Sequence, residues 1–389
     1  MAPSIVFYIS SHGLGHASRC VEVINAIFAK RPETRIGVRT SAPRWLFDLS
    51  IRGKVQFSNL ETDTGVVQVD ALTLDEADSI RRAAAFHSDL VTRAASETRV
   101  LRELGAGLIV GDVPPLAFAV GASAGIASIG LGNFTWDWIY ADYPRVRLAP
   151  SLLPAIRGAY AKASMALRLP MHGGFESFAN VKDIPFVARH ATKTREEVVK
   201  TLKLPGEKPF ILSSFGGYGL AGLDIEPLTK LKKYTVLQTA TVPMSRARTA
   251  TPLAEKKGSF VTINEEAMYD AGIRYEDLVA ASEAVVTKPG YGIISESIAN
   301  DAAILYTARG HFPEYDVLVE EMPKYVRNAF ISQDDLFAGK WETHVDKLLA
   351  QPKIKKKPET NGADVAAEIL LKALDKPPKK PRGRPRAKF

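Results

Sequence analysis

The chain has 389 residues, of which 46% are hydrophobic and 24% charged, and its formal net charge is +8. This length predicts two domains rather than one, and no apolar run reaches the roughly 18 residues that a membrane-spanning helix needs. The single cysteine, Cys20, excludes an internal disulfide, and no Cys/His cluster has the spacing of a zinc site. We expect a globular, cytoplasmic protein without a signal peptide, because no basic region precedes the first apolar run.

The positive charge is concentrated at the C-terminus. Residues 353–389 contain 12 Lys and Arg against 4 Asp and Glu, so the other 352 residues contain 39 of each sign. Residues 376–389 are too charged and too rich in proline to fold alone, so we expect a disordered tail. Its "PRGRP" is the core of an AT-hook, in which Arg382, Gly383 and Arg384 would enter an A·T-rich minor groove and hold the protein at the nucleoid. A solvated basic tail is the alternative.

Short apolar runs alternate with helical patterns along the rest of the chain, which predicts parallel sheets covered by helices. In the first half the strand candidates are 4–9, 35–40, 55–60, 107–112 and 126–133. The series restarts at "PFILSSFGG", residues 209–217, and continues through 234–240, 259–265, 284–288 and 302–308. We therefore predict an α/β protein with an N-terminal Rossmann-like domain (1–190), a linker region (191–208), a second Rossmann-like domain (209–350) and a C-terminal segment with a final helix (351–375).

The first strand runs into "SSHGLGHASR", residues 10–19. Gly13 and Gly15 allow a tight turn and a close approach of backbone to a ligand, and the loop lies where open α/β sheets bind ligands. His12 and His16 lie in this loop, where either histidine could contact a ligand. A tight turn without a ligand is the alternative.

Two later strand ends of the same half carry further candidates. Asp112 ends "LIVGD" and could orient the imidazole of His16, or simply cap a helix. "GNFTWDWIYADY" places Trp136 and Trp138 just after another strand, where they could line an acceptor pocket or form a small core cluster.

The second half offers two glycine-containing loops for a phosphate group. "SSFGGYG" contains Gly216 and Gly217 but does not match the dinucleotide fingerprint G-x-G-x-x-G. "VTKPGYGIISESIAN" passes from a strand through a turn into a helix, so its lysine and the helix N-terminus form a cationic socket for a diphosphate. The acid one turn into that helix could bind a ribose diol or could merely favour the helix dipole. The residues that we assign to this socket are Lys288, Gly290, Gly292, Ser295 and Glu296.

A loop after the last strand candidate of the second half, "ARGHFPEYDVLVEE", contains Glu314 and Asp316. These carboxylates could bind sugar hydroxyls, and a solvated helix start is the alternative. No Asp-x-Asp sequence occurs, so a metal-bridged diphosphate is not indicated.

Together these motifs resemble those of GT-B glycosyltransferases, whose two Rossmann-like domains face each other across a cleft. "GLGHASRCVEVINAI" is similar to the first loop and helix of UDP-sugar transferases, and "KPGYGIISES" to their donor signature. Longer stretches, "HGLGHASR", "VVQVDALTLD", "GNFTWDWIYADY" and "KPGYGIISESIA", resemble the glycosyltransferase-like N-terminal region of L-arabinokinases over residues 4–335. The kinase phosphate loop of that family is absent, so the resemblance does not imply arabinose phosphorylation.

The resemblance implies an inverting, metal-independent transferase that needs no cofactor and takes a UDP-sugar as donor. It makes His16 the base, Asp112 its orienting acid, Lys288 a phosphate contact and Glu296 the ribose ligand. His12 is then a structural or acceptor-contacting residue rather than a second base. Two departures, Lys288 where a histidine is usual and the absence of an Asp-Gln pair at 311–316, leave the donor sugar open. The rival readings are a UDP-sugar epimerase of the same fold and a DNA-tethered nucleotide-sugar-binding protein.

Overall fold

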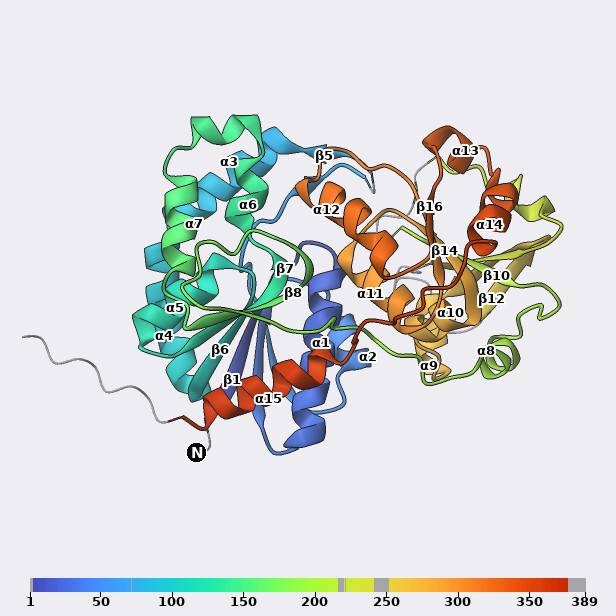
Figure 1. Cartoon of the computed structure of the whole chain (residues 1–389). Coiled ribbons are helices and arrows are strands. Elements are labelled where there is room, and N and C mark those ends of the chain that lie inside the picture. Colours follow the sequence, from blue (N-terminus) through green and yellow to red (C-terminus); the bar gives the residue numbers. More distant parts are fainter. Residues whose placement is uncertain (1–2, 71, 216–219, 221, 241–251, 377–389) are drawn as a thin grey trace, which may run out of the picture.

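The computed structural model describes residues 3–70, 72–215, 220, 222–240 and 252–376. Two domains, each built on a seven-stranded sheet, lie side by side and are joined by extended chain (Figure 1). The two series of strands that the sequence predicts are therefore confirmed as separate sheets. Among the described residues, no helix is long and apolar enough to cross a membrane.

The N-terminal sheet is parallel throughout and has the order β3-β2-β1-β6-β7-β8-β9. Its strands are β1 (Ser4–Ile9), β2 (Arg35–Thr40), β3 (Val55–Asn59), β6 (Ala106–Asp112), β7 (Ser128–Phe134), β8 (Met165–Gly173) and β9 (Val181–Asp183). Its helices are α1 (Leu14–Lys30), α2 (Arg44–Ser50), α3 (Glu76–Ser88), α4 (Leu90–Leu104), α5 (Pro115–Ala124), α6 (Trp136–Ala141) and α7 (Leu152–Tyr160). A small hairpin, β4 (Val67–Gln68) and β5 (Leu74–Asp75), stands outside the sheet.

Alternate residues of β1 enter two different cores, as expected for a strand buried on both faces. Ile5 and Phe7 pack with α1, whereas Val6 and Tyr8 pack against the side of the sheet covered by α3, α4, α5 and α7. Both cores hold β1 at the centre of the sheet, so the loop that follows it is fixed in position.

The C-terminal sheet has the order β12-β13-β11-β10-β14-β15-β16, and only the edge strand β12 is antiparallel among its described strands. Its strands are β10 (Phe210–Ser214), β11 (Thr235–Ala240), β12 (Ala254–Lys257), β13 (Phe260–Asn264), β14 (Ser282–Thr287), β15 (Ala303–Tyr306) and β16 (Asn328–Phe330). Its helices are α8 (Arg195–Leu202), α9 (Glu265–Asp270), α10 (Tyr275–Ala281), α11 (Tyr291–Ala299), α12 (Pro313–Glu321), α13 (Gln333–Phe337) and α14 (Trp341–Leu349).

The predicted linker region 191–208 contains a helix that belongs to the C-terminal domain. Thr194 and Glu197 form a reciprocal capping box that starts α8, and Val198 and Leu202 are buried against Phe210 of β10. The polar composition of 191–208 reflects the exposed face of this helix.

The last helix, α15 (Gly362–Leu374), returns to the N-terminal domain and packs along α1 (Figure 1). Ala366, Leu370 and Leu374 join the core that contains α1, and Lys30 pairs with Glu368 at 3.1 Å on the surface. The predicted final helix is confirmed, and its packing ties the C-terminal segment to the N-terminal domain.

Candidate active site in the interdomain cleft

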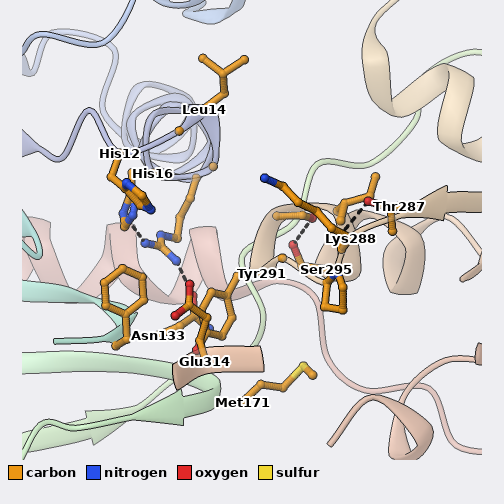
Figure 2. A pocket seen from close by; sticks show the side chains of 18 of the residues that line it. His12, Leu14, His16, Asn133, Met171, Thr287, Lys288, Tyr291, Ser295 and Glu314 are labelled. Atoms are coloured by element: carbon orange, nitrogen blue, oxygen red, sulfur yellow. Dashed lines mark hydrogen bonds between the residues drawn. The ribbon is translucent and has the colours of Figure 1, made fainter. Parts of the chain in front are cut away.

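A cavity of about 450 Å³ lies between the two domains, a volume that suits a small-molecule ligand. It is lined from the N-terminal domain by the loop after β1, the start of α1 and the end of β7, and from the C-terminal domain by the ends of β10 and β14 and the start of α11. Figure 2 shows His12 and His16 on one side of this cavity, with Lys288 and Ser295 on the opposite side. The structure thus brings together the two motifs that the sequence singled out.

The loop after β1 needs its glycines. Gly13 has φ +71° and precedes the first residue of α1, a conformation that costs most residues free energy but glycine little. Gly15 faces the other domain, because a Cβ atom added to Gly292 would lie 3.7 Å from the Cα of Gly15. The N-terminus of α1 therefore meets the N-terminus of α11 at the cleft, and both helix dipoles direct positive potential there.

His16 lies in the first turn of α1 and is 5% exposed. Its Nδ1 atom is 2.9 Å from Oδ1 of Asp112, the last residue of the neighbouring strand β6. A proton on Nδ1 is then donated to the carboxylate, which leaves the lone pair on Nε2 to accept a proton from a ligand. The pairing predicted for His16 and Asp112 has the geometry of a base and its orienting acid.

Asp112 is fully buried and is bound by more than the histidine. Arg19 donates from Nε to Oδ2 at 2.8 Å and from Nη2 to Oδ1 at 2.6 Å, and Cys20 donates from Sγ to Oδ2 at 3.1 Å. Burial alone would raise the pKa of Asp112, but the charges of Arg19 and His16 outweigh it and lower that pKa. Asp112 is therefore a carboxylate, and Arg19 is a partner that sequence reasoning missed.

The other histidine of the loop, His12, accepts a hydrogen bond on Nδ1, whereas His16 faces a carboxylate there. His12 Nδ1 accepts the backbone N–H of Val66 at 3.3 Å, so a neutral His12 carries its proton on Nε2 and is a donor rather than a base. Burial, followed by the charges of His16, Arg309 and Lys288, lowers the pKa of His12 to about 3. This supports the prediction that His12 contacts a ligand or the protein and is not a second base.

A second buried carboxylate, Asp63, is another residue that sequence reasoning missed. It accepts hydrogen bonds from Ser10 Oγ at 3.0 Å and from Trp136 Nε1 at 2.7 Å. Burial raises the pKa of Asp63 to about 6, although the nearby His16 opposes this shift. No periodicity or glycine loop marks residue 63, which precedes the hairpin β4–β5, so the sequence carried no signal for it.

The opposite wall of the cavity is cationic. Burial, with the charge of Arg309 as the next cause, lowers the pKa of Lys288 to about 8. Gly290 caps α11, and Ser295 lies in that helix with its Oγ 2.9 Å from the carbonyl of Gly292. This socket of lysine and helix N-terminus is the arrangement that the sequence predicts for a diphosphate.

Glu296 points to the other side of α11, into an adjoining cavity of about 570 Å³ that shares Ser214, Phe215 and Gly292 with the first. Arg189 donates to Oε1 of Glu296 from Nε at 2.7 Å, and its Nη1 lies 3.3 Å from Glu276. Burial raises the pKa of Glu296 against the opposing charge of Arg189. Glu296 therefore lines a cavity as expected, but with an arginine already bound to it.

Of the two carboxylates that the sequence predicts as sugar ligands, only Glu314 lies at the cavity. Glu314 lines the main cavity and is 7% exposed, and its Oε2 atom has no hydrogen-bond partner among the described residues. Arg309 lies beside it, with Nη2 3.9 Å from Oε1, and also lines the cavity. Asp316 is exposed on α12 and does not line the cavity, so the structure does not bring it to the site.

The predicted tryptophans belong to the wall behind the cavity rather than to its surface. Trp136 is 1% exposed and makes an edge contact with His12 at 5.5 Å between ring centroids. Trp138 packs against Gly173 and Gly174. Gly216 and Gly217, and the tail residues Arg382, Gly383 and Arg384, lie outside the described residues. Within the described part of the chain, no three His, Cys, Asp or Glu side chains gather as a metal site.

One curated protein is similar to this chain over most of the chain's length. The chain is 29% identical over 372 residues to L-arabinokinase from Arabidopsis thaliana. The matched region covers 94% of this chain and 34% of that protein. The chain thus spans about a third of the length of the curated relative that it matches, and the predicted resemblance to L-arabinokinases is confirmed. No protein-family model matches the chain.

Two solved structures illustrate the fold. A UDP-glucosyltransferase from Polygonum tinctorium is 13% identical, with 97% of this chain and 99% of that chain covered and a TM-score of 0.57. UGT2 from Phytolacca americana, solved with UDP-2fluoro-glucose and pterostilbene, is 14% identical, with 96% and 94% covered and a TM-score of 0.56. The chain therefore has the two-domain α/β fold of the GT-B glycosyltransferases.

Proposed function

We propose that the chain is an inverting glycosyltransferase that works without a metal ion and moves a sugar from a UDP-sugar to a hydroxyl group of an acceptor. The observation that carries the proposal is the opposition of two groups across one cavity. His16, paired with Asp112, lines the N-terminal wall, and Lys288 lines the C-terminal wall beside the start of α11. A base on one side and an anion socket on the other are what a single displacement at a sugar carbon requires.

In this reaction Nε2 of His16 accepts the proton of the acceptor hydroxyl as its oxygen attacks the anomeric carbon. The bond between that carbon and the diphosphate oxygen breaks on the opposite face, so the configuration inverts. The carboxylate of Asp112 accepts a hydrogen bond from the Nδ1–H of the resulting imidazolium and holds its ring in place, while the proton stays on the ring. Lys288 and the backbone N–H groups at the start of α11 stabilise the charge that develops on the diphosphate.

The adjoining cavity suits the nucleoside of the donor. It runs along the ends of β10, β11 and β13, where Rossmann-like domains bind nucleotides, and Glu296 lies within it. The two cavities share residues at the start of α11, so a nucleoside in one places its diphosphate at the boundary and its sugar in the other. The two solved structures named above support UDP, because one is a UDP-glucosyltransferase and the other is a complex with UDP-2fluoro-glucose.

The test combines binding with turnover in the full chain and a His16→Ala variant. We expect UDP and at least one UDP-sugar to raise the unfolding temperature of both proteins, because a ligand that binds only the folded state stabilises it. Transfer to an acceptor panel should fall by about 10² to 10⁴-fold in His16→Ala. Full turnover by the variant would reject His16 as the base, and an isomerised donor formed without any acceptor would show an epimerase instead.

A further inference from the structure

The carboxylate that orients His16 is already neutralised. Arg19 forms a two-point ion pair with Asp112, and its Nη2 atom also lies 3.0 Å from His16 Nδ1. A further hydrogen bond fixes the guanidinium, in which Nη1 of Arg19 donates to Oδ1 of Asn133. Asn133 is itself fixed, because its Nδ2 donates to the carbonyl of Pro170 at 2.7 Å. Protonation of His16 next to this pair adds a positive charge to a buried group of net charge zero, which is unfavourable in a low-dielectric interior.

The charge that could balance an imidazolium comes from the other buried carboxylate. Asp63 is 2% exposed and is bound by the neutral donors Ser10 and Trp136. Burial raises the pKa of Asp63, and the charge of the nearby His16 partly offsets this rise. Phe134 contacts the His16 ring at 5.4 Å and Trp136 at 5.0 Å between centroids, so the same aromatic wall holds both groups.

The remaining titratable and charged groups around His16 do not duplicate this role. His12 is neutral, and Lys288 and Arg309 belong to the cationic wall across the cleft. Burial raises the pKa of Cys20 and of Tyr291, so both are uncharged. On the His16 side of the cleft, the ionised groups near this histidine among the residues that the structure describes are therefore Asp112 paired with Arg19, and Asp63.

We propose that Arg19 and Asp63 are positioning residues that control, in opposite directions, how readily His16 takes up a proton. Arg19 cancels the negative charge of Asp112, and Asp63 supplies the negative charge that stabilises the imidazolium. This inference deepens the proposed function, on which its kinetic part rests, by assigning the strength of the base to two residues that do not touch the sugar. The orientation of His16 then comes from Asp112 and its proton affinity from Asp63.

The experiment measures the titration of His16 directly, in the full chain with isotope-labelled histidine rings. NMR follows the ring signals with pH, and the signal missing from His16→Ala identifies the residue. In Arg19→Gln the midpoint should move to higher pH, and in Asp63→Asn to lower pH, each by about one unit or more, the effect of a buried charge nearby. The acidic limb of the transfer rate should move with the same sign in each variant.

Three further variants separate charge from structure. Arg19→Lys keeps the charge and should leave the midpoint near its wild-type value. In the double variant Arg19→Gln/Asp63→Asn the midpoint of His16 should also lie near its wild-type value, because the two opposite effects cancel. If one of the single variants unfolds, the double variant and the remaining single variant still test the idea. Asp137→Asn is the control, because it removes a buried carboxylate that pairs with Arg157 at 3.2 Å. This variant should leave the midpoint of His16 unchanged.

Midpoints that move in the same direction in Arg19→Gln and Asp63→Asn, or that do not move, would overturn the inference. Opposite shifts by NMR in a protein that transfers no sugar to any acceptor tested would leave the inference standing and count against the proposed function.

Discussion

His16 Nδ1 and Asp112 Oδ1 lie 2.9 Å apart although 96 positions separate the two residues in the chain. Strands β1 and β6 are parallel neighbours, and their register pairs Ile9 with Asp112. The helix that carries His16 starts a few residues after β1, so the sheet register delivers the histidine to the carboxylate. The pair therefore depends on the order of the strands and not on a local motif.

Because Arg19 is bound to Asp112, we predict that Asp112→Asn lowers stability as well as activity. The substitution leaves a guanidinium that is 10% exposed without its charge partner, and breaking a buried ion pair in this way costs about 3 to 5 kcal/mol. Urea unfolding of the variant measures this loss. The double variant Arg19→Gln/Asp112→Asn removes the orphaned charge and should recover part of the stability, since contacting residues are not additive. Equal stability of wild type and Asp112→Asn would show that the ion pair contributes little.

Glu296 provides a test of the nucleotide site. If its carboxylate binds the ribose, Glu296→Gln should weaken UDP and UDP-sugars alike by about 1.5 to 3 kcal/mol, the usual contribution of a hydrogen bond to a charged group. Isothermal titration calorimetry with UDP alone measures the effect. Asp316→Asn is the matched control, because Asp316 is exposed on α12 and should leave the UDP affinity unchanged. Unchanged affinity in Glu296→Gln would assign the carboxylate to Arg189 alone.

Strand patterns and loop motifs predicted the existence of two sheets and five strands of each, but they missed β8, β9, β12 and β16. The apolar runs that end in Asp112 and Lys288 mark β6 and β14, and parallel strands place such ends at one edge of each sheet. The basic tail stays a prediction, because its residues lie outside the described part of the chain.

The residues that sequence reasoning missed act through contacts that no local pattern reveals. Arg19 has the sequence pattern of an ordinary polar residue of α1, yet it points inward because Asp112 compensates its charge and Asn133 accepts a hydrogen bond from it. Asp63 lies in a loop, and Ser10 and Trp136 from two other segments make its burial possible. Asp316 does not reach the cavity for a related reason, since helix α12 turns that position outward.

A contact between the domains should depend on pH through His311. Its Nδ1 lies 2.9 Å from Glu76, its Nε2 lies 2.7 Å from Asp142, and the neighbouring Gly310 donates from its backbone N–H to Leu72. The hydrogen bond to Glu76, with burial as an opposing effect, gives His311 a raised pKa. Its stabilising effect is therefore complete below the ordinary histidine pKa and is lost as the pH rises through the raised value.

We expect His311→Gln to lower the unfolding temperature more at about pH 5 than at about pH 8, across the range in which histidine titrates. Differential scanning fluorimetry at several pH values measures the difference from wild type. His190→Gln is the control, since His190 is exposed and bonds only to the hydroxyl of Thr360 among its described partners. A difference independent of pH would mean that the charge of His311 does not stabilise the contact.

Binding of a diphosphate should be coupled to protonation of Lys288. The pKa of this lysine is lowered to about 8 by burial and by the charge of Arg309, so near and above that pH a fraction of the free protein has a neutral amine. An anion in the socket favours the ammonium form and raises the pKa, so binding takes up a proton there and the affinity for UDP falls as the pH increases through this range. Well below that pH, Lys288 is already charged, and the uptake should vanish.

Calorimetry of UDP binding in buffers with different ionisation enthalpies counts the protons taken up. The terminal phosphate of UDP itself titrates near about pH 6, so the quantity to compare is the difference in proton uptake between wild type and Lys288→Met. The wild type should take up more protons than the variant at about pH 8, the difference should disappear near about pH 6, and the variant should bind UDP more weakly. Lys357→Met is a matched control on the surface, where Lys357 pairs with Asp301 and is 66% exposed. Equal proton uptake by wild type and Lys288→Met at about pH 8 would place the coupled group elsewhere, and Lys288 would then be a structural residue of the loop before α11 rather than a ligand of the diphosphate.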